Sequence, residues 1–258
     1  MSTIGYGDPR RVHELLALRA RAFASRIEGE RTDAVAGRWV EIGGAFAFDW
    51  SGYRCVHDFG DEALQRWSEL LDWFADGLAP TFETWCGEGL LVTARALTLL
   101  GYQPVHAQAL FAASLDSLAP THANTPLEIS RDPNDFGRLG AQMWNEGDPD
   151  RARALARQHA GPNWCCATVL EAGQPVAGAS LYLDGPHAFH ANALTLPAHQ
   201  GRGMHGRLLA AQIELARARG KTWIVADTQV GSGSGRNLER AGLRCVATCL
   251  HWQPLQQD

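Results

Sequence analysis

The stretch from Ala188 to Gly220 constrains the fold of this chain more than any other. It begins as an apolar, strand-like run, crosses a glycine-rich turn at 201–206 and continues as a helix with apolar residues at helical spacing. Glycines let the backbone approach a ligand closely, and the unpaired N–H groups of a first helical turn favour an anion. The stretch therefore predicts a phosphate-binding site between a strand and the helix that follows it.

Two interpretations of this loop use the same residues. Gly201, Gly203 and Gly206 spell G-x-G-x-x-G, and Asp227 follows 21 residues after Gly206, the spacing of a dinucleotide-binding fingerprint. However, four residues at 197–200 separate the strand from the first glycine, and little chain follows to complete a doubly wound sheet. A nicotinamide-dependent enzyme is therefore the less favoured alternative.

The other interpretation is a resemblance to the Q/R-x-x-G-x-G/A loop of the GCN5-related N-acetyltransferases, the GNAT superfamily, carried by Gln200, Gly201, Arg202, Gly203 and Met204. It extends through a strand at 223–229, a helix-like stretch at 233–243 and a closing strand at 244–252. One departure is His205 at the sixth motif position, normally Gly or Ala, with Gly206 one place late. The resemblance implies a GNAT fold, an α/β architecture with a mixed sheet, in the C-terminal half.

The first half of the chain shows a similar order of elements without the loop. A strand at 81–87, a helix ending at Gly101 and a long strand that follows parallel the last three elements of the second half. We therefore expect a tandem protein, with a degenerate GNAT-like lobe at 1–120 and a GNAT acetyltransferase domain at 121–258. The Pro-containing stretch 118–129 is the predicted linker. An unrelated α+β domain is the alternative for the first half.

Composition excludes several classes of protein. The chain has 258 residues, 45% hydrophobic and 20% charged, which is ordinary for a globular protein. Its net charge of -5, without a basic stripe, gives no reason to expect nucleic acid as a partner. No apolar run approaches the ~20 residues that span a bilayer, and no signal-peptide pattern begins the chain. We expect a cytoplasmic protein that does not bind membranes, a monomer or homodimer.

The six cysteines follow no C-x-x-C spacing. Buried, reduced thiols are the expected state, ahead of metal ligands or a disulfide framework. The sequence therefore predicts no metal.

The resemblance implies acetyl-CoA, or another acyl-CoA, as co-substrate. The loop amides would hold the pyrophosphate, the strand backbone would pair with the pantetheine arm, and the helix after 232 would lie beside that arm. Ser232, at the start of this helix, has two interpretations: a contact with the cofactor, or a cap for the helix. The predicted cofactor-binding residues are Leu194, Leu196, Gln200, Gly201, Arg202, Gly203, Met204, His205, Gly206, Ser234 and Asn237.

The chemistry implied is direct attack of a primary amine on the thioester in a ternary complex, which needs a general base and a general acid. His190 and Asn192 are expected to share a face of the central strand, with His190 as base and Asp227 as the next candidate. Leu238 occupies the position where many members of the family carry a Tyr that acts as the general acid. The leading function is an N-acyltransferase acting on a small or peptide amine; the alternative is a non-catalytic acyl-CoA sensor.

Overall fold

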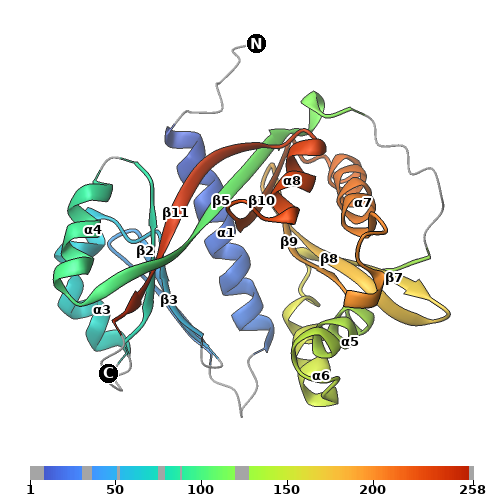
Figure 1. Ribbon diagram of the computed structural model, residues 1–258, viewed down its shortest axis with the longest axis horizontal. Helices are drawn as coiled ribbons and strands as arrows, with labels where there is room; N and C mark the ends of the chain where they lie inside the picture. The colour runs from blue at the N-terminus through green and yellow to red at the C-terminus, as the bar shows by residue number, and fades with distance from the viewer. Residues whose placement is uncertain are drawn as a thin grey trace. The chain divides into compact units, whose positions relative to one another are not determined.

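The computed structural model describes residues 9–30, 37–50, 53–74, 79–87, 89–119 and 128–255. The chain divides into two compact units (Figure 1). Unit 1 combines Met1–Glu30 with Leu110–Val246, and unit 2 combines Arg31–Ala109 with Ala247–Asp258. Each unit is therefore discontinuous in sequence.

This spatial division differs from a single cut near residue 120. The strands β5 (Tyr102–Ser114) and β11 (Arg244–Pro254) each contribute residues to both units, and the first helix belongs with the second half of the chain. Most of the predicted linker, 120–127, lies outside the described residues. That the chain consists of two related domains at 1–120 and 121–258 stays a prediction.

Unit 2 is a sheet covered by helices on one face. The strands β1 (Arg38–Ile42), β2 (Ala45–Trp50) and β3 (Tyr53–His57) form an antiparallel meander, and β3 runs parallel to β4 (Thr81–Trp85). β4 pairs antiparallel with β11, which is followed by β5. Val56, Phe82 and Trp252 of these strands lie in one core cluster with Leu70 and Leu97 from the helices.

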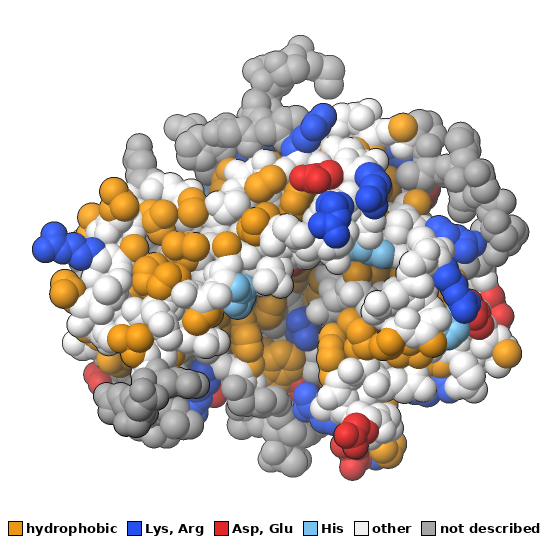
Figure 2. Space-filling view, viewed as in Figure 1, with side chains coloured by type: hydrophobic (Ala, Val, Ile, Leu, Met, Phe, Trp, Pro, Cys, Tyr) orange, Lys and Arg blue, Asp and Glu red, His pale blue; other side chains and the backbone are white. Residues whose placement is uncertain are grey.

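The helices of unit 2 are α2 (Asp61–Gln65), α3 (Trp67–Phe74) and α4 (Leu90–Leu99). Apolar residues at helical spacing after Asp61 predict one helix with Asp61 as its N-cap, but Gly60 is the N-cap and the helix is interrupted at Arg66. Asp61 lies in the first turn of α2, where its carboxylate accepts a hydrogen bond from Thr93 Oγ1 of α4 at 3.0 Å. Helix α4 exposes Leu91, Val92 and Leu99. Figure 2 shows several hydrophobic side chains at the surface on its left side, where Figure 1 places α3 and α4.

Unit 1 contains the glycine-rich loop at 201–206. Its helices are α1 (Pro9–Glu30), α5 (Pro133–Trp144), α6 (Pro149–Gln158), α7 (Met204–Ala218) and α8 (Gly233–Arg240), and its own strands are β6 (Ile129–Ser130), β7 (Trp164–Glu171), β8 (Gln174–Asp184), β9 (His187–Thr195) and β10 (Trp223–Gln229). β6 to β9 pair antiparallel, β9 and β10 pair parallel, and β5 follows β10. The predicted α/β fold with a mixed sheet is confirmed.

Alternate residues of these strands pack against helices on opposite faces. Ala167 and Ala179 contact Met204 and Leu208 of α7, whereas Cys166 and Leu194 pack against α5, through Phe136 and Leu139. Figure 1 shows α7 on one side of β7–β9 and the α5–α6 pair on the other. The two faces therefore bring different groups to the strand β9.

The pairing of β9 with β10 stops before either strand ends. Its last partners are His190 and Ala226, although β9 continues to Thr195 and β10 to Gln229. Beyond that point β9 remains paired with β8 alone, through Leu194 and Thr195. The strands thus leave the β10 side of β9 open next to the glycine loop.

Within the described residues, no helix is both long and apolar enough to cross a membrane.

Candidate functional site

A cavity of about 600 Å³ lies where the glycine loop meets the end of β9 and the start of α8. All its lining residues belong to unit 1. Eight of the predicted residues line it: Leu194, Gln200, Gly201, Gly203, Met204, His205, Ser234 and Asn237. The fold therefore brings most of the predicted set together around one hollow.

The glycine loop has the backbone that its sequence predicts. Gly201 and Gly203 have φ angles of +77° and +71°, a region that side chains disfavour. Gly203 is the N-cap of α7 and supplies no side chain to the first helical turn. A Cβ at either position would have no atom within 4 Å, so the space beside the loop is open to a ligand.

A chain of hydrogen bonds runs along the floor of the cavity from α8 into the core. Asn237 Nδ2 lies 3.0 Å from His205 Nδ1, His205 Nε2 lies 3.3 Å from His190 Nε2, and His190 Nδ1 lies 2.5 Å from Gln212 Oε1. Because Gln212 Oε1 accepts from His190 Nδ1–H, a neutral His190 accepts from His205 Nε2–H, and His205 in turn accepts from Asn237. The partners thus fix one tautomer for each ring.

The electrostatics of the two rings agree with this assignment. Burial lowers the pKa of His190 to about 4, and burial also lowers the pKa of His205. Both imidazoles are therefore neutral near pH 7. His190 is buried and reaches the cavity only through His205, which lines it.

His190 and Asn192 do not share a face, so that prediction is wrong. Asn192 has a φ of +51° at an irregularity in the β8–β9 register. Its side chain turns toward the α6 side, where Nδ2 lies 3.0 Å from His159 Nε2, while His190 faces Gln212 of α7. A strand bulge adds a residue and breaks the alternation on which the prediction rests.

Asp227, the other predicted catalytic residue, is held by an ion pair. Its Oδ2 lies 2.5 Å from Nε of Arg19 on α1, and the Arg19 side chain is only 3% exposed. Arg19 also lies over the Phe23 ring. No local pattern predicts this pair, because the two residues are separated by more than 200 positions in the sequence.

Three predicted cofactor residues, Leu196, Arg202 and Gly206, do not line the cavity, and Met204 borders it although its side chain is mostly buried. The Leu196 N–H donates to the Val176 carbonyl at 3.0 Å, so it is already bonded to the neighbouring strand and is not available to an added one. Arg202 reaches toward Glu171, 3.5 Å away, and Gly206 is not part of the cavity lining. The Met204 side chain is buried in the core.

Sequence reasoning missed several lining residues. Ala193 and Thr195 lie on β9 beside the predicted leucines, and Arg240 donates to Asn237 Oδ1 at 2.8 Å. The i,i+3 spacing of Asn237 and Arg240 on one helix was the signal that could have found Arg240. Ser232 caps α8, since its Oγ accepts from the Gly235 N–H at 3.0 Å.

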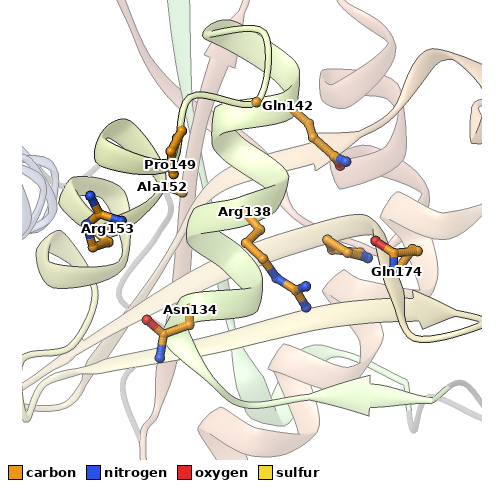
Figure 3. A pocket seen from close by; sticks show the side chains of 9 residues that line it. Asn134, Arg138, Gln142, Pro149, Ala152, Arg153 and Gln174 are labelled. Atoms are coloured by element: carbon orange, nitrogen blue, oxygen red, sulfur yellow. The ribbon is translucent and has the colours of Figure 1, made fainter.

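A second hollow of about 400 Å³ lies between α5, α6 and the β8 turn. Figure 3 shows Arg138 of α5 pointing toward Gln174, with Pro149 and Ala152 of α6 along the other side. Arg138 is paired with Asp135 of its own helix. This hollow shares no residue with the glycine-loop cavity.

The comparisons with known proteins agree with this architecture. The model of the acetyltransferase (GNAT) family matches residues 127–238, which include the whole glycine loop and most of α8. Residues 127–238 are therefore a domain of the GNAT family. No curated protein gives a significant sequence match.

Solved structures match nearly the whole chain. A GCN5-related N-acetyltransferase from Kribbella flavida has a TM-score of 0.63 at 18% identity, covering 92% of this chain and 96% of its own. One from Sphaerobacter thermophilus has a TM-score of 0.61 at 16% identity, covering 83% and 77%. A tandem GNAT protein from the clavulanic acid biosynthesis pathway covers 99% and 98%, at 12% identity and a TM-score of 0.58. At these identities the likeness shows the fold.

The nicotinamide alternative needs a doubly wound parallel sheet. Here the strands β6 to β9 around the motif are antiparallel. The fold therefore does not support a dinucleotide fingerprint at Gly201, Gly203 and Gly206.

Proposed function

We propose that the protein is an acyl-CoA-dependent N-acyltransferase that transfers an acetyl group from acetyl-CoA to a primary amine. The observation that carries the proposal is the open cavity at the N-terminus of α7, bordered by Gly201 and Gly203 in left-handed conformations. Backbone N–H groups and the positive end of the helix dipole attract phosphate oxygens at such a place. The GNAT match over 127–238 supports the same assignment.

The pantetheine arm would lie along the open side of β9. Residues two apart in a strand direct their backbone groups to the same side, so Leu194 and Leu196 both face β8. Ala193 and Thr195 face the other way and line the cavity. We therefore assign the backbone contacts to Ala193 and Thr195, with Ser234 and Asn237 on the opposite wall.

For the proton of the attacking amine we propose a route through two histidines. His205 Nδ1 takes the proton in place of its bond from Asn237, and its Nε2 proton passes to His190 Nε2, 3.3 Å away. His190 is then the buried base and His205 its contact with the cavity. Leu238, buried in the core, cannot protonate the departing thiolate, so the proton returns from His190 through His205 to the thiolate sulfur.

The first experiment is calorimetric titration of the purified protein with acetyl-CoA, with NADH and NADPH in parallel. We expect binding of acetyl-CoA alone, followed by acyl transfer when a panel of small and peptide amines is added. Binding of a nicotinamide nucleotide instead would overturn the assignment. Acetyl-CoA binding without transfer to any amine would favour a non-catalytic sensor, the candidate suggested by the missing Tyr at Leu238.

A substitution in the loop tests where the donor binds. We expect Gly203→Val to weaken acetyl-CoA binding by at least tenfold, because a side chain would enter the open space and φ of +71° is strained for it by about 1–2 kcal/mol. Gly206→Ala is the matched control: Gly206 lies inside α7 and outside the cavity lining. It should bind acetyl-CoA normally, and equal losses in both variants would contradict the placement.

A further inference from the structure

We propose that unit 2 contains a binding site for a divalent transition-metal ion of the zinc class, formed by Glu83, Cys249 and His251. The site is distinct from the glycine-loop cavity, and all three residues belong to unit 2. It does not depend on the proposed acyltransferase function.

The strand register brings these side chains together. In the antiparallel pair of β4 and β11, His251 lies directly opposite Glu83, and Cys249 lies two residues before His251. Residues two apart in a strand point to the same face. Phe82 and Trp252, their neighbours along the strands, point into the helix-covered core, so the three polar groups lie on the other face of the sheet.

The distances between the groups suit a metal ion. One ligand atom from each of the three residues lies within 4.8 Å of the other two, and His251 Nε2 is 3.4 Å from Glu83 Oε1. Ligands bound to zinc at about 2.0–2.3 Å in a tetrahedron are separated by about 3.3–3.8 Å. Small side-chain rotations would therefore bring all three atoms to bonding distance.

The charges of the set also suit a divalent cation. The Glu83 side chain is 1% exposed and Cys249 is fully buried, so water would not stabilise a negative charge on either group. One carboxylate, one thiolate and a neutral imidazole balance the charge of a dication. A thiolate with an imidazole selects zinc-like metals over magnesium or calcium.

A second set, Cys55, His57 and Glu83, shares the same carboxylate. His57 Nε2 is 3.4 Å from Glu83 Oε1, but the Tyr53 hydroxyl also lies within 2.9 Å of that nitrogen. His57 is fully buried, whereas His251 is 11% exposed and stacks on the exposed ring of His106 at 4.1 Å. We therefore assign the ion to Cys249 and His251, where it has a route from solvent.

The bound ion would connect β4 to β11. Because β4 and β11 are far apart in the sequence, the ion would link two distant segments of unit 2. A metal that binds the folded state alone raises the stability of the fold.

The test uses the full-length protein, stripped with a chelator, equilibrated with Zn²⁺ and freed of excess metal. We expect one zinc per chain by elemental analysis, a higher melting temperature than the stripped protein, and, with Co²⁺ instead, a sulfur-to-cobalt charge-transfer band. Wild-type protein that retains no zinc and shows no such band would overturn the proposal.

Paired variants identify the ligands. Cys249→Ser and His251→Gln should each lose the zinc, the cobalt band and the zinc-dependent stabilisation. Cys55→Ser, from the neighbouring set, and Cys86→Ser, at an exposed cysteine, should retain all three. Circular dichroism of the stripped proteins checks that each variant is folded. Loss of the band in Cys55→Ser with retention in Cys249→Ser would overturn the assignment.

Discussion

At the scale of single residues, the conformation of Asn192 decides which groups meet around β9. Its positive φ turns the side chain to the α6 side, where it contacts His159 and the Ser180 hydroxyl. His190 is left on the α7 side, linked to His205 and Gln212. One irregular residue therefore separates a structural polar network from the network that borders the cavity.

The ion pair between Arg19 and Asp227 should contribute strongly to stability. Asp227→Asn removes the carboxylate charge from the buried Arg19 guanidinium, and breaking such a pair costs about 3 kcal/mol or more. We expect this loss in the free energy of unfolding measured with urea. In the double variant Arg19→Met, Asp227→Asn the loss should be clearly smaller than the sum of the two single losses. Additive losses would mean that the pair is not coupled.

The proton route through His205 makes a kinetic prediction. We expect His190→Ala and His205→Ala each to lower kcat by about 100-fold, the usual size of a lost general base, with a much smaller change in acetyl-CoA affinity. Both variants should also lose the same ionisation from the pH profile of kcat/KM. An unchanged profile in His190→Ala would exclude His190 as the base, and a change in His205→Ala alone would assign the role to His205.

At the scale of secondary-structure elements, the helices of unit 1 differ in how their N-termini are capped. Asp132 and Asp148 cap α5 and α6 through their side chains, and Ser232 caps α8. The helix α7 differs, because Gly203 caps it without a side-chain hydrogen bond. Among these four helix starts, that of α7 alone lacks a side-chain cap, and it borders the cavity together with the start of α8.

The two serines at the start of α8 should therefore behave differently. Ser232→Ala removes the bond to the Gly235 N–H and should cost about 1 kcal/mol of stability. Ser234→Ala removes a cavity-lining hydroxyl and should leave stability within about 0.5 kcal/mol while weakening acetyl-CoA binding. Urea unfolding and calorimetric titration of both variants separate the two roles, and equal stability losses would contradict them.

Elements with a strong local signal could be predicted from the sequence. Apolar residues at helical spacing over 10–29 predict the helix that is observed as α1. Gly173, between two strand-like runs, predicts the turn of the β7–β8 hairpin, in which Ala172 and Gly173 have positive φ. The Gly201–Gly203 turn was also predicted, because glycine spacing is a local property. The faces of His190 and Asn192 were not, because a bulge depends on the neighbouring strand.

Contacts between residues far apart in the sequence could not be predicted either. Nothing local pairs Arg19 with Asp227 or places Cys249 beside Glu83, since these contacts depend on the sheet order. The cysteines show the same limit. They were expected to be buried, but Cys86 and Cys245 are exposed and Cys165 is half-buried.

At the scale of the whole molecule, the buried histidines link stability to pH. Burial is the main reason that the pKa of His159 falls to about 3, and His190 falls to about 4, against 6.5 in the unfolded chain. His159 bonds the Leu155 carbonyl through Nδ1 and meets Asn192 through Nε2, so the ring is held in its neutral form. Two neutral rings are thus built into unit 1.

The sign of the effect follows from proton uptake. Above pH 6.5 both rings are neutral in both states, and the full stability is present. Between pH 6.5 and about 4 the unfolded chain binds protons that the folded protein does not, so stability falls as the pH falls. Each ring contributes up to roughly 1.4 kcal/mol per pH unit in this range.

We expect the free energy of unfolding, measured with urea at pH 7 and pH 5, to decrease on acidification, and the decrease to be smaller in His159→Gln by about 1–2 kcal/mol. Glutamine cannot titrate, so the variant removes the contribution of His159 whatever its stability at pH 7. A His159→Gln protein that loses as much stability between pH 7 and pH 5 as the wild type would show that this ring is not kept neutral by the fold.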